Sequence, residues 1–281
     1  MTELGVFARV FPSGPPRTVA TAIRAAGFTA TQLNLSAVQR PTLDTTLTSQ
    51  DAQGIAAAFT AAGVRIWGLS GTFNAIDPDE SARQQAVEAC LNVIRCAPDI
   101  GAEVVTLCTG TRDPINMWRA HTDNTSKQAW ADLRATLDAL LPTADAAGVR
   151  LGIEPEPGNV IRDAAAAALL LQQLGDDARH LAIVLDPANL LTVDTAANQE
   201  RILGVAFAAL GSHTAAVHAK DVVAFGYAAP GHGSLDYDLV MRLHATLPRP
   251  VPVIAQDLVA EDAPRVHAFL QTHASKHRMQ A

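Results

Sequence analysis

Short apolar runs alternate eight times with longer Ala- and Leu-rich stretches, and this alternation restricts the fold more than any other feature of the chain. The short runs predict strands, and the stretches between them predict helices. The predicted strands cover residues 4–11, 29–35, 64–69, 103–109, 150–154, 182–186, 214–219 and 251–256. The predicted helices cover residues 17–26, 49–62, 79–99, 126–147, 163–174, 198–210, 238–247 and 261–274.

Glycines and capping residues mark the ends of these helices. Glycines that follow a predicted helix are Gly27, Gly63, Gly101, Gly148, Gly175 and Gly211. Glycine at such a position can take the left-handed backbone conformation that ends a helix, because it has no Cβ atom to clash. Ser126, Asp163 and Asp238 stand where three helices begin, and we expect them to be N-caps.

Eight strand–helix units with no linker between them predict a single (β/α)8 barrel, a TIM barrel, that forms one domain over residues 1–281. Residues 275–281 are expected to be a frayed C-terminal tail. The alternative is an open, doubly wound sheet. Such a sheet usually has a Gly-rich phosphate-binding turn after its first strand, and the segment Pro12 to Pro16 is not such a turn.

Composition and charge exclude several classes of protein. Hydrophobic residues make up 48% of the chain and charged residues 17%, which excludes a disordered chain. The net charge of -7 argues against nucleic acid or an anionic membrane surface as a partner. No apolar run approaches the ~20 residues that span a bilayer. The three cysteines are odd in number and form no CxxC pair, and the N-terminus shows no signal-peptide pattern, so we expect a cytoplasmic location.

A polar residue ends each of the last four predicted strands: Glu154, Asp186, His218 and Gln256. Their spacings are 32, 32 and 38 residues. Since one strand–helix unit takes roughly 30 residues or more, the four residues occupy equivalent positions on successive strands. The alternation of side chains along a strand places all four on the inward face. We therefore expect them to converge at the mouth of the barrel.

Two carboxylates, an imidazole and an amide oxygen together suit one divalent metal ion, either Mn, Mg, Co, Zn or Fe. The alternative is that each residue is an ordinary polar group that bonds to a neighbour. Burial of two unpaired carboxylates without a cation would be costly, which favours the metal site. Glu156 could replace Glu154 as a ligand, but prolines flank it, so we assign it to the loop above the strand.

Several segments of the chain resemble the xylose isomerase-like TIM barrels, and specifically the sugar phosphate isomerase/epimerase family. The matching segments are Gly152–Pro155, Asp186–Asn189, His218–Asp221 and Pro230–Tyr237, together with Gly110–Asp113 and Met117–Arg119 after the fourth strand. The resemblance rests on the combination of these segments and spans nearly the whole chain.

The resemblance implies a divalent metal held by Glu154, Asp186, His218 and Gln256, with substrate oxygens completing the coordination. It also implies catalytic roles for Glu154, Gln256 and Lys220, although a salt bridge to an acidic neighbour would explain Lys220 equally well. Residues expected to contact the substrate are Trp118, His121, Asn159, Asn189 and His232. For His232, exposure to solvent in a mobile loop is the competing interpretation.

The chain departs from the family pattern at two positions. The family usually has glutamate where this chain has Gln256, and often has histidine where this chain has Asn189. An amide can ligate a metal but cannot accept and return a proton. Asp257 is not expected to take over, because adjacent strand residues face opposite sides. Glu154 is then the one carboxylate left for proton transfer, which favours isomerisation or dehydration over two-base epimerisation.

We therefore expect a metal-dependent isomerase or epimerase-type enzyme that acts on a sugar, polyol or related hydroxy-carbonyl compound through proton abstraction and a metal-stabilised enediolate. The first alternative is a dehydratase of an inosose-like or hydroxy-keto substrate, with His121 or Lys220 as the acid. Further alternatives are a non-catalytic sugar-binding barrel, a DNA-repair endonuclease of the same superfamily and a Schiff-base aldolase. The absence of a Gly-rich loop or an Arg cluster favours an unphosphorylated substrate. The sequence is compatible with both a monomer and a homo-oligomer.

Overall fold

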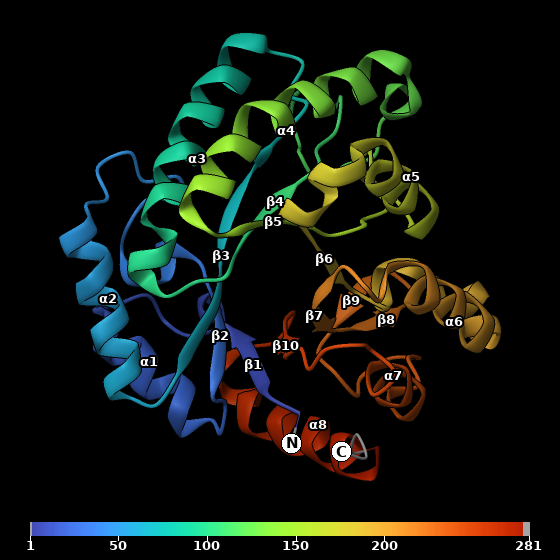
Figure 1. Cartoon of the computed structure of the whole chain (residues 1–281). Helices are drawn as coiled ribbons and strands as arrows, with labels where there is room; N and C mark the ends of the chain where they lie inside the picture. The colour runs from blue at the N-terminus through green and yellow to red at the C-terminus, as the bar shows by residue number, and fades with distance from the viewer. Residues whose placement is uncertain (1, 278–281) are drawn as a thin grey trace.

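The computed structural model describes residues 2–277 and shows a closed barrel of eight parallel strands in the order β1-β10-β7-β6-β5-β4-β3-β2 (Figure 1). The barrel strands are β1 (Leu4–Phe7), β2 (Ala30–Leu33), β3 (Arg65–Asn74), β4 (Val104–Cys108), β5 (Arg150–Ile153), β6 (Leu181–Leu185), β7 (Thr214–Ala219) and β10 (Val253–Ala255). A short antiparallel hairpin, β8 (Asp221–Val223) and β9 (Gly226–Ala228), follows β7 outside the barrel. The predicted single (β/α)8 barrel is confirmed.

In the described part of the chain, eight α-helices surround the strands (Figure 1). They are α1 (Pro16–Ala25), α2 (Ser49–Ala61), α3 (Glu80–Ile100), α4 (Lys127–Ala147), α5 (Ala164–Leu174), α6 (Gln199–Leu210), α7 (Tyr237–His244) and α8 (Ala263–Lys276). Short 3-10 helices occupy Ala8–Val10, Leu35–Val38, Thr122–Thr125, Gly175–His180, Ala188–Leu190, Val193–Asn198 and Ala260–Asp262. No helix of the described chain is long and apolar enough to cross a membrane.

The N-cap predictions are confirmed at two helices and wrong at one. Ser126 and Asp163 accept a backbone N–H in the first turn of α4 and α5, respectively. At α7 the cap is Asp236, whose carboxylate accepts from Leu239 N, and not the predicted Asp238. Asp238 lies two residues later, in the first turn of α7, and pairs with side chains of α8.

Three further expectations need correction. The predicted first strand over 4–11 ends at Phe7, where the chain turns into a 3-10 helix. Gly211 has a φ of -57°, so its backbone is right-handed, unlike that of the other five glycines named above. Most of the predicted tail over 275–281 lies outside the described residues, and Ser275 and Lys276 still belong to α8.

Two apolar clusters form the core. The larger cluster lies between the strands and the helices, and it contains Leu185 and Val217. The smaller cluster fills the interior of the barrel and contains Val184, Ala216 and Ile254. Because side chains alternate along a strand, the residue two positions after each of these inward residues also faces inward. These residues are Asp186, His218 and Gln256. The polar residues at the strand ends therefore lie on top of the inner cluster, at the barrel mouth.

Candidate functional site

A cavity of about 440 Å³ lies at the carboxyl ends of the strands. This volume falls in the range of small-molecule sites. The cavity has two unlike halves. Residues that follow β5, β7 and β10 bring charge: Glu154, Glu156, Lys220 and Asp257. Residues of β3 and β4, and residues in or directly after β2, bring neutral amides and hydroxyls: Gln32, Asn34, Ser70, Thr72 and Thr106.

Three predicted metal ligands meet beside this cavity, and one of them, Glu154, lines it. Glu154 follows β5, Asp186 follows β6, and His218 lies in β7. One ligand atom from each lies within 4.8 Å of the other two. His218 Nδ1 is 3.1 Å from Glu154 Oε2, and both Asp186 and His218 are only 1% exposed. Two carboxylates and an imidazole this close could hold a divalent ion.

Gln256, after β10, belongs to the same cluster. Its Nε2 donates a hydrogen bond of 2.7 Å to Asp186 Oδ2 and lies 3.4 Å from His218 Nδ1. The four residues at the strand ends therefore lie together at the barrel mouth, as the sequence predicts. Gln256 nevertheless presents its amide nitrogen to the cluster, so it acts here as a donor to Asp186 and not as an oxygen ligand.

Lys220 is buried beside the same carboxylate. Its Nζ lies 3.2 Å from Asp186 Oδ2 and 3.9 Å from Asp257 Oδ2. Tyr227, carried by the hairpin, covers the ammonium group at 3.7 Å from the ring centroid. Burial alone would lower the pKa of Lys220, but Asp186 and Glu154 raise it above its ordinary value. Lys220 is therefore a protonated donor within the cavity wall.

The cavity carboxyls differ strongly in acidity. Burial opposes ionisation of Glu154, yet the charge and hydrogen bond of His218 outweigh it and lower its pKa to about 2. Burial and the charge of Glu154 raise the pKa of Glu156 to about 7. Asn189 fixes Glu154, because its Nδ2 donates to Glu154 Oε1 at 2.8 Å and to Pro155 O at 3.2 Å. The expected substrate contact Asn189 is thus buried behind Glu154.

The sequence analysis did not identify Gln32, which lies beneath the cluster on β2. Its Oε1 lies 2.9 Å from His218 Nε2, and its Nε2 donates to Ser70 Oγ and Thr106 Oγ1. The only signal in the sequence is a polar residue at an inward position of a predicted strand. Phe7 supports the imidazole from another side, edge-on at 5.1 Å.

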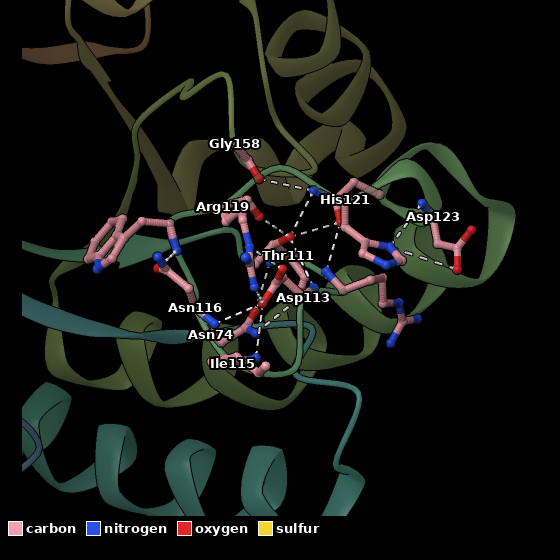
Figure 2. Close-up of polar contacts among 12 residues, drawn as sticks. Asn74, Thr111, Asp113, Ile115, Asn116, Arg119, His121, Asp123 and Gly158 are labelled. Carbon is pink, nitrogen blue, oxygen red and sulfur yellow. Dashed lines mark hydrogen bonds and ion pairs between the residues drawn. The ribbon is translucent and has the colours of Figure 1, made fainter. Parts of the chain in front are cut away.

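The loop after β4 is held by a network of polar contacts (Figure 2). The Asp113 carboxylate pairs with Arg119 and also accepts from Ile115 N and Asn116 N. Trp118, also in this loop, lines the cavity and is 51% exposed. The predicted substrate contact Trp118 is therefore placed at the cavity wall.

His121 points elsewhere, although it follows Trp118 closely in sequence. Its Nδ1 accepts from Asp123 N, and Figure 2 shows the ring turned towards Asp123. His121 lines a separate groove beside α4 and α5. It does not line the barrel cavity, so it is not available as an acid for a substrate bound there.

Asn159 and His232 also lie away from the cavity lining. Asn159 is buried, donates to Glu156 Oε2 at 3.1 Å, and accepts from Gly110 N at 2.6 Å. His232 is exposed in a loop that is organised by Asp221, whose carboxylate accepts from Gly231 N and Leu235 N. The structure therefore gives Asn159 a supporting position behind Glu156 and leaves His232 in solvent.

Asp257 overturns one expectation. Strand alternation predicts that it faces away from Gln256, but β10 ends at Ala255, and Asp257 has a φ of +56°. This left-handed backbone, uncommon for a residue other than glycine, turns its carboxylate into the cavity wall near Lys220. The barrel mouth thus has a carboxylate on the β10 side after all. Glu156, assigned to the loop above β5, also lines the cavity.

Comparison with known proteins agrees with this architecture. The profile of the xylose isomerase-like TIM barrel family matches residues 20–246. The chain belongs to this family. No curated protein matches the chain by sequence.

Several solved structures share this xylose isomerase-like barrel. The 3-keto-D-glucoside 4-epimerase of E. coli superposes with a TM-score of 0.77 at 16% identity, covering 97% of this chain and 100% of that one. The D-psicose 3-epimerase of Clostridium cellulolyticum H10 gives 0.74 at 13% identity, covering 98% and 99%. An L-ribulose 3-epimerase gives 0.74 at 16% identity, covering 99% and 96%. At these identities the likeness establishes the fold.

Proposed function

We propose that the chain is a divalent-metal-dependent enzyme of the isomerase/epimerase kind that acts on an unphosphorylated sugar, polyol or related hydroxy-carbonyl compound. The observation that carries this proposal is the cluster of Glu154, Asp186 and His218, whose ligand atoms lie within 4.8 Å of one another beside the cavity that Glu154 lines. The sugar epimerases with the same fold support the choice of reaction class.

The donor set fits a divalent ion. Metal–ligand distances near 2.0–2.2 Å place the ligands of one ion about 3–4 Å apart, and a small inward adjustment would bring the three groups to that spacing. Glu154, Asp186 and His218 would hold the ion, and Gln256 would join them through its oxygen only after its amide turned over. When bound, the ion supplies Lewis-acid stabilisation of negative charge that develops on a substrate oxygen.

The neutral half of the cavity supports a polyhydroxylated substrate. Asn34 is buried and lines the cavity, and its Oδ1 has no hydrogen-bond partner among the described residues. An unpaired buried acceptor is costly, and a substrate hydroxyl would satisfy it. The cationic lining residues are Arg9 and Lys220, and Lys220 is already engaged by Asp186. This charge pattern favours an uncharged substrate over a sugar phosphate.

Glu154 is the base in this proposal, because its carboxylate is ionised and opens into the cavity. It would remove a proton from the carbon beside the substrate carbonyl and return it to the former carbonyl carbon, while the proton of the α-hydroxyl moves to the carbonyl oxygen, which is aldose–ketose isomerisation. Lys220 would hold the oxygen at which charge develops, or protonate a leaving hydroxyl if the reaction is a dehydration. Gln256 would orient Asp186 but would carry no proton.

Epimerisation is the second candidate, and Asp257 is the observation that favours it. Inversion at carbon needs a proton acceptor on one face of the substrate and a proton donor on the other. Glu154 follows β5 and Asp257 follows β10, so the cavity has one carboxylate on each of two well-separated strands. The Asp257→Asn variant separates the candidates: isomerisation should survive this change, and epimerisation should be lost.

The first experiment is elemental analysis of the purified protein beside a Glu154→Ala/Asp186→Ala double variant. We expect about one equivalent of Mn, Mg, Co, Zn or Fe in the natural chain and none in the variant. Ketoses and inositol-type ketones are then incubated with the loaded protein in D₂O, and loss of the α-proton signal is followed by NMR. Failure to bind Mn or Zn even in excess would refute the metal site, and ligand binding without exchange would leave a sugar-binding barrel.

A further inference from the structure

The two ring nitrogens of His218 have different surroundings. Nδ1 faces the carboxylate cluster, 3.1 Å from Glu154 Oε2. Nε2 faces the opposite way, into the barrel, where it lies 2.9 Å from Gln32 Oε1. Both side chains are almost fully buried, so solvent cannot take the place of this contact.

The orientation of the Gln32 amide follows from its other partners. Its Nε2 lies 3.0 Å from Ser70 Oγ and 3.1 Å from Thr106 Oγ1. Thr106 directs its own hydroxyl proton to Leu69 O at 3.3 Å, which leaves its oxygen as an acceptor. Both protons of the Gln32 amide group are thereby used, so the oxygen of this amide faces His218 and accepts from Nε2.

We propose that Gln32 is a positioning residue that keeps a proton on Nε2 of His218, so that Nδ1 is the nitrogen that faces Glu154 and Asp186 and is unprotonated when a divalent cation binds there. This inference rests on the metal site of the proposed function. A histidine ligand must present an unprotonated nitrogen to the metal, and the hydrogen bond of its other nitrogen fixes both tautomer and ring direction. Ser70 and Thr106 act one step further away, because they hold the Gln32 amide.

The proposal predicts a weaker metal site when the acceptor is removed. Gln32→Met keeps the length of the side chain but leaves the buried Nε2–H of His218 without a partner. Loss of such a supporting contact typically reduces metal affinity about 10–100-fold. Gln32→Glu restores an acceptor and creates a carboxylate–histidine–metal arrangement, so this conservative variant is expected to retain the wild-type affinity.

The chain offers a matched control two residues after Gln32, directly past the end of β2. Asn34 also donates to Ser70 Oγ and lines the same cavity, but His218 is not among its hydrogen-bond partners. Asn34→Leu therefore removes an amide from the same wall without touching the imidazole. Thr106→Val, which removes one of the two groups that hold Gln32, is expected to weaken the metal site less than Gln32→Met.

The experiment is titration of the metal-free proteins with Co²⁺, with the Kd taken from calorimetry and the ligand set followed by visible absorption. Thermal denaturation of each metal-free variant checks its fold. The expected order of affinity is wild type, Asn34→Leu and Gln32→Glu together, then Thr106→Val, then Gln32→Met. If Gln32→Met does not fold, the comparison of Gln32→Glu with Thr106→Val decides in its place.

Three results would overturn the inference. Gln32→Met could bind Co²⁺ as tightly as the wild type, Gln32→Glu could fail to retain the affinity, or Asn34→Leu could be as weak as Gln32→Met. Each would show that the Gln32 acceptor does not position the ligand. A wild-type protein that binds no Co²⁺ would instead refute the proposed function, and the inference with it.

Discussion

Replacing Gln256 by glutamate changes one hydrogen-bond donor into an acceptor at almost constant volume. Gln256 Nε2 donates to Asp186 Oδ2 at 2.7 Å, and Asp186 is buried with Lys220 as its nearest cation. In the Gln256→Glu variant two carboxylates meet at this point. Without a metal, the variant should be less stable than the wild type, because a hydrogen bond becomes a repulsion between like charges.

The size of the effect follows from that contact. A hydrogen bond to a charged group contributes about 1.5–3 kcal/mol to the free energy of unfolding, and we take about 2 kcal/mol. For chains of this size 1 kcal/mol shifts Tm by about 2–4 °C, so the metal-free variant should melt about 4–8 °C below the wild type. A divalent ion between the carboxylates removes the repulsion, so Mn²⁺ should raise the Tm of the variant more than that of the wild type.

The assay is differential scanning calorimetry at pH 8 on EDTA-treated protein, with and without Mn²⁺. Gln172→Glu, on the exposed face of α5, is the matched control for an added charge. At pH 5 the Tm deficit of Gln256→Glu should shrink, since two close carboxylates share a proton more readily at lower pH. An unchanged metal-free Tm, or an Mn²⁺ effect no larger than in the wild type, would refute this account of the Gln256 contact.

Two predictions concern stability. Gly110→Ala and Gly148→Ala both place alanine at a positive φ, which costs about 1–2 kcal/mol. A Cβ at Gly110 would also lie 2.1 Å from Asn74 Oδ1, whereas a Cβ at Gly148 would meet no atom within 4 Å. Urea unfolding should therefore show a larger loss of unfolding free energy for Gly110→Ala than for Gly148→Ala. Equal losses would contradict the packing argument. Burial lowers the pKa of His244, whose Nε2 bonds to Val251 O, below its ordinary 6.5. The stability that this neutral imidazole gives is present above pH 6.5 and is lost as the pH falls through the folded-state pKa. In the His244→Gln variant, the free energy of unfolding measured in urea should therefore depend less on pH between pH 7 and pH 5. An unchanged pH dependence would refute this assignment.

The sequence determined the barrel and most of the carboxylate–imidazole cluster at its mouth, because both depend on short-range regularities. Strand and helix periods, together with glycines such as Gly101 and Gly148, place the elements to within a few residues of their observed bounds. The period of two along a strand then fixes which side chains face inward. Glu154, Asp186 and His218 could therefore be placed together at the barrel mouth from their positions along the chain.

Tertiary structure alone decided which other groups reach the cluster. Gln32 touches His218 across 186 residues of sequence, and no local pattern records that contact. Asp257 enters the cavity because the strand ends before it and its backbone turns left-handed, where the alternation rule no longer applies. His121 leaves the cavity because its loop folds around Asp113 and Arg119. Loop directions and long-range hydrogen bonds depend on the packed three-dimensional arrangement, and the periodicity of the chain contains no information about them.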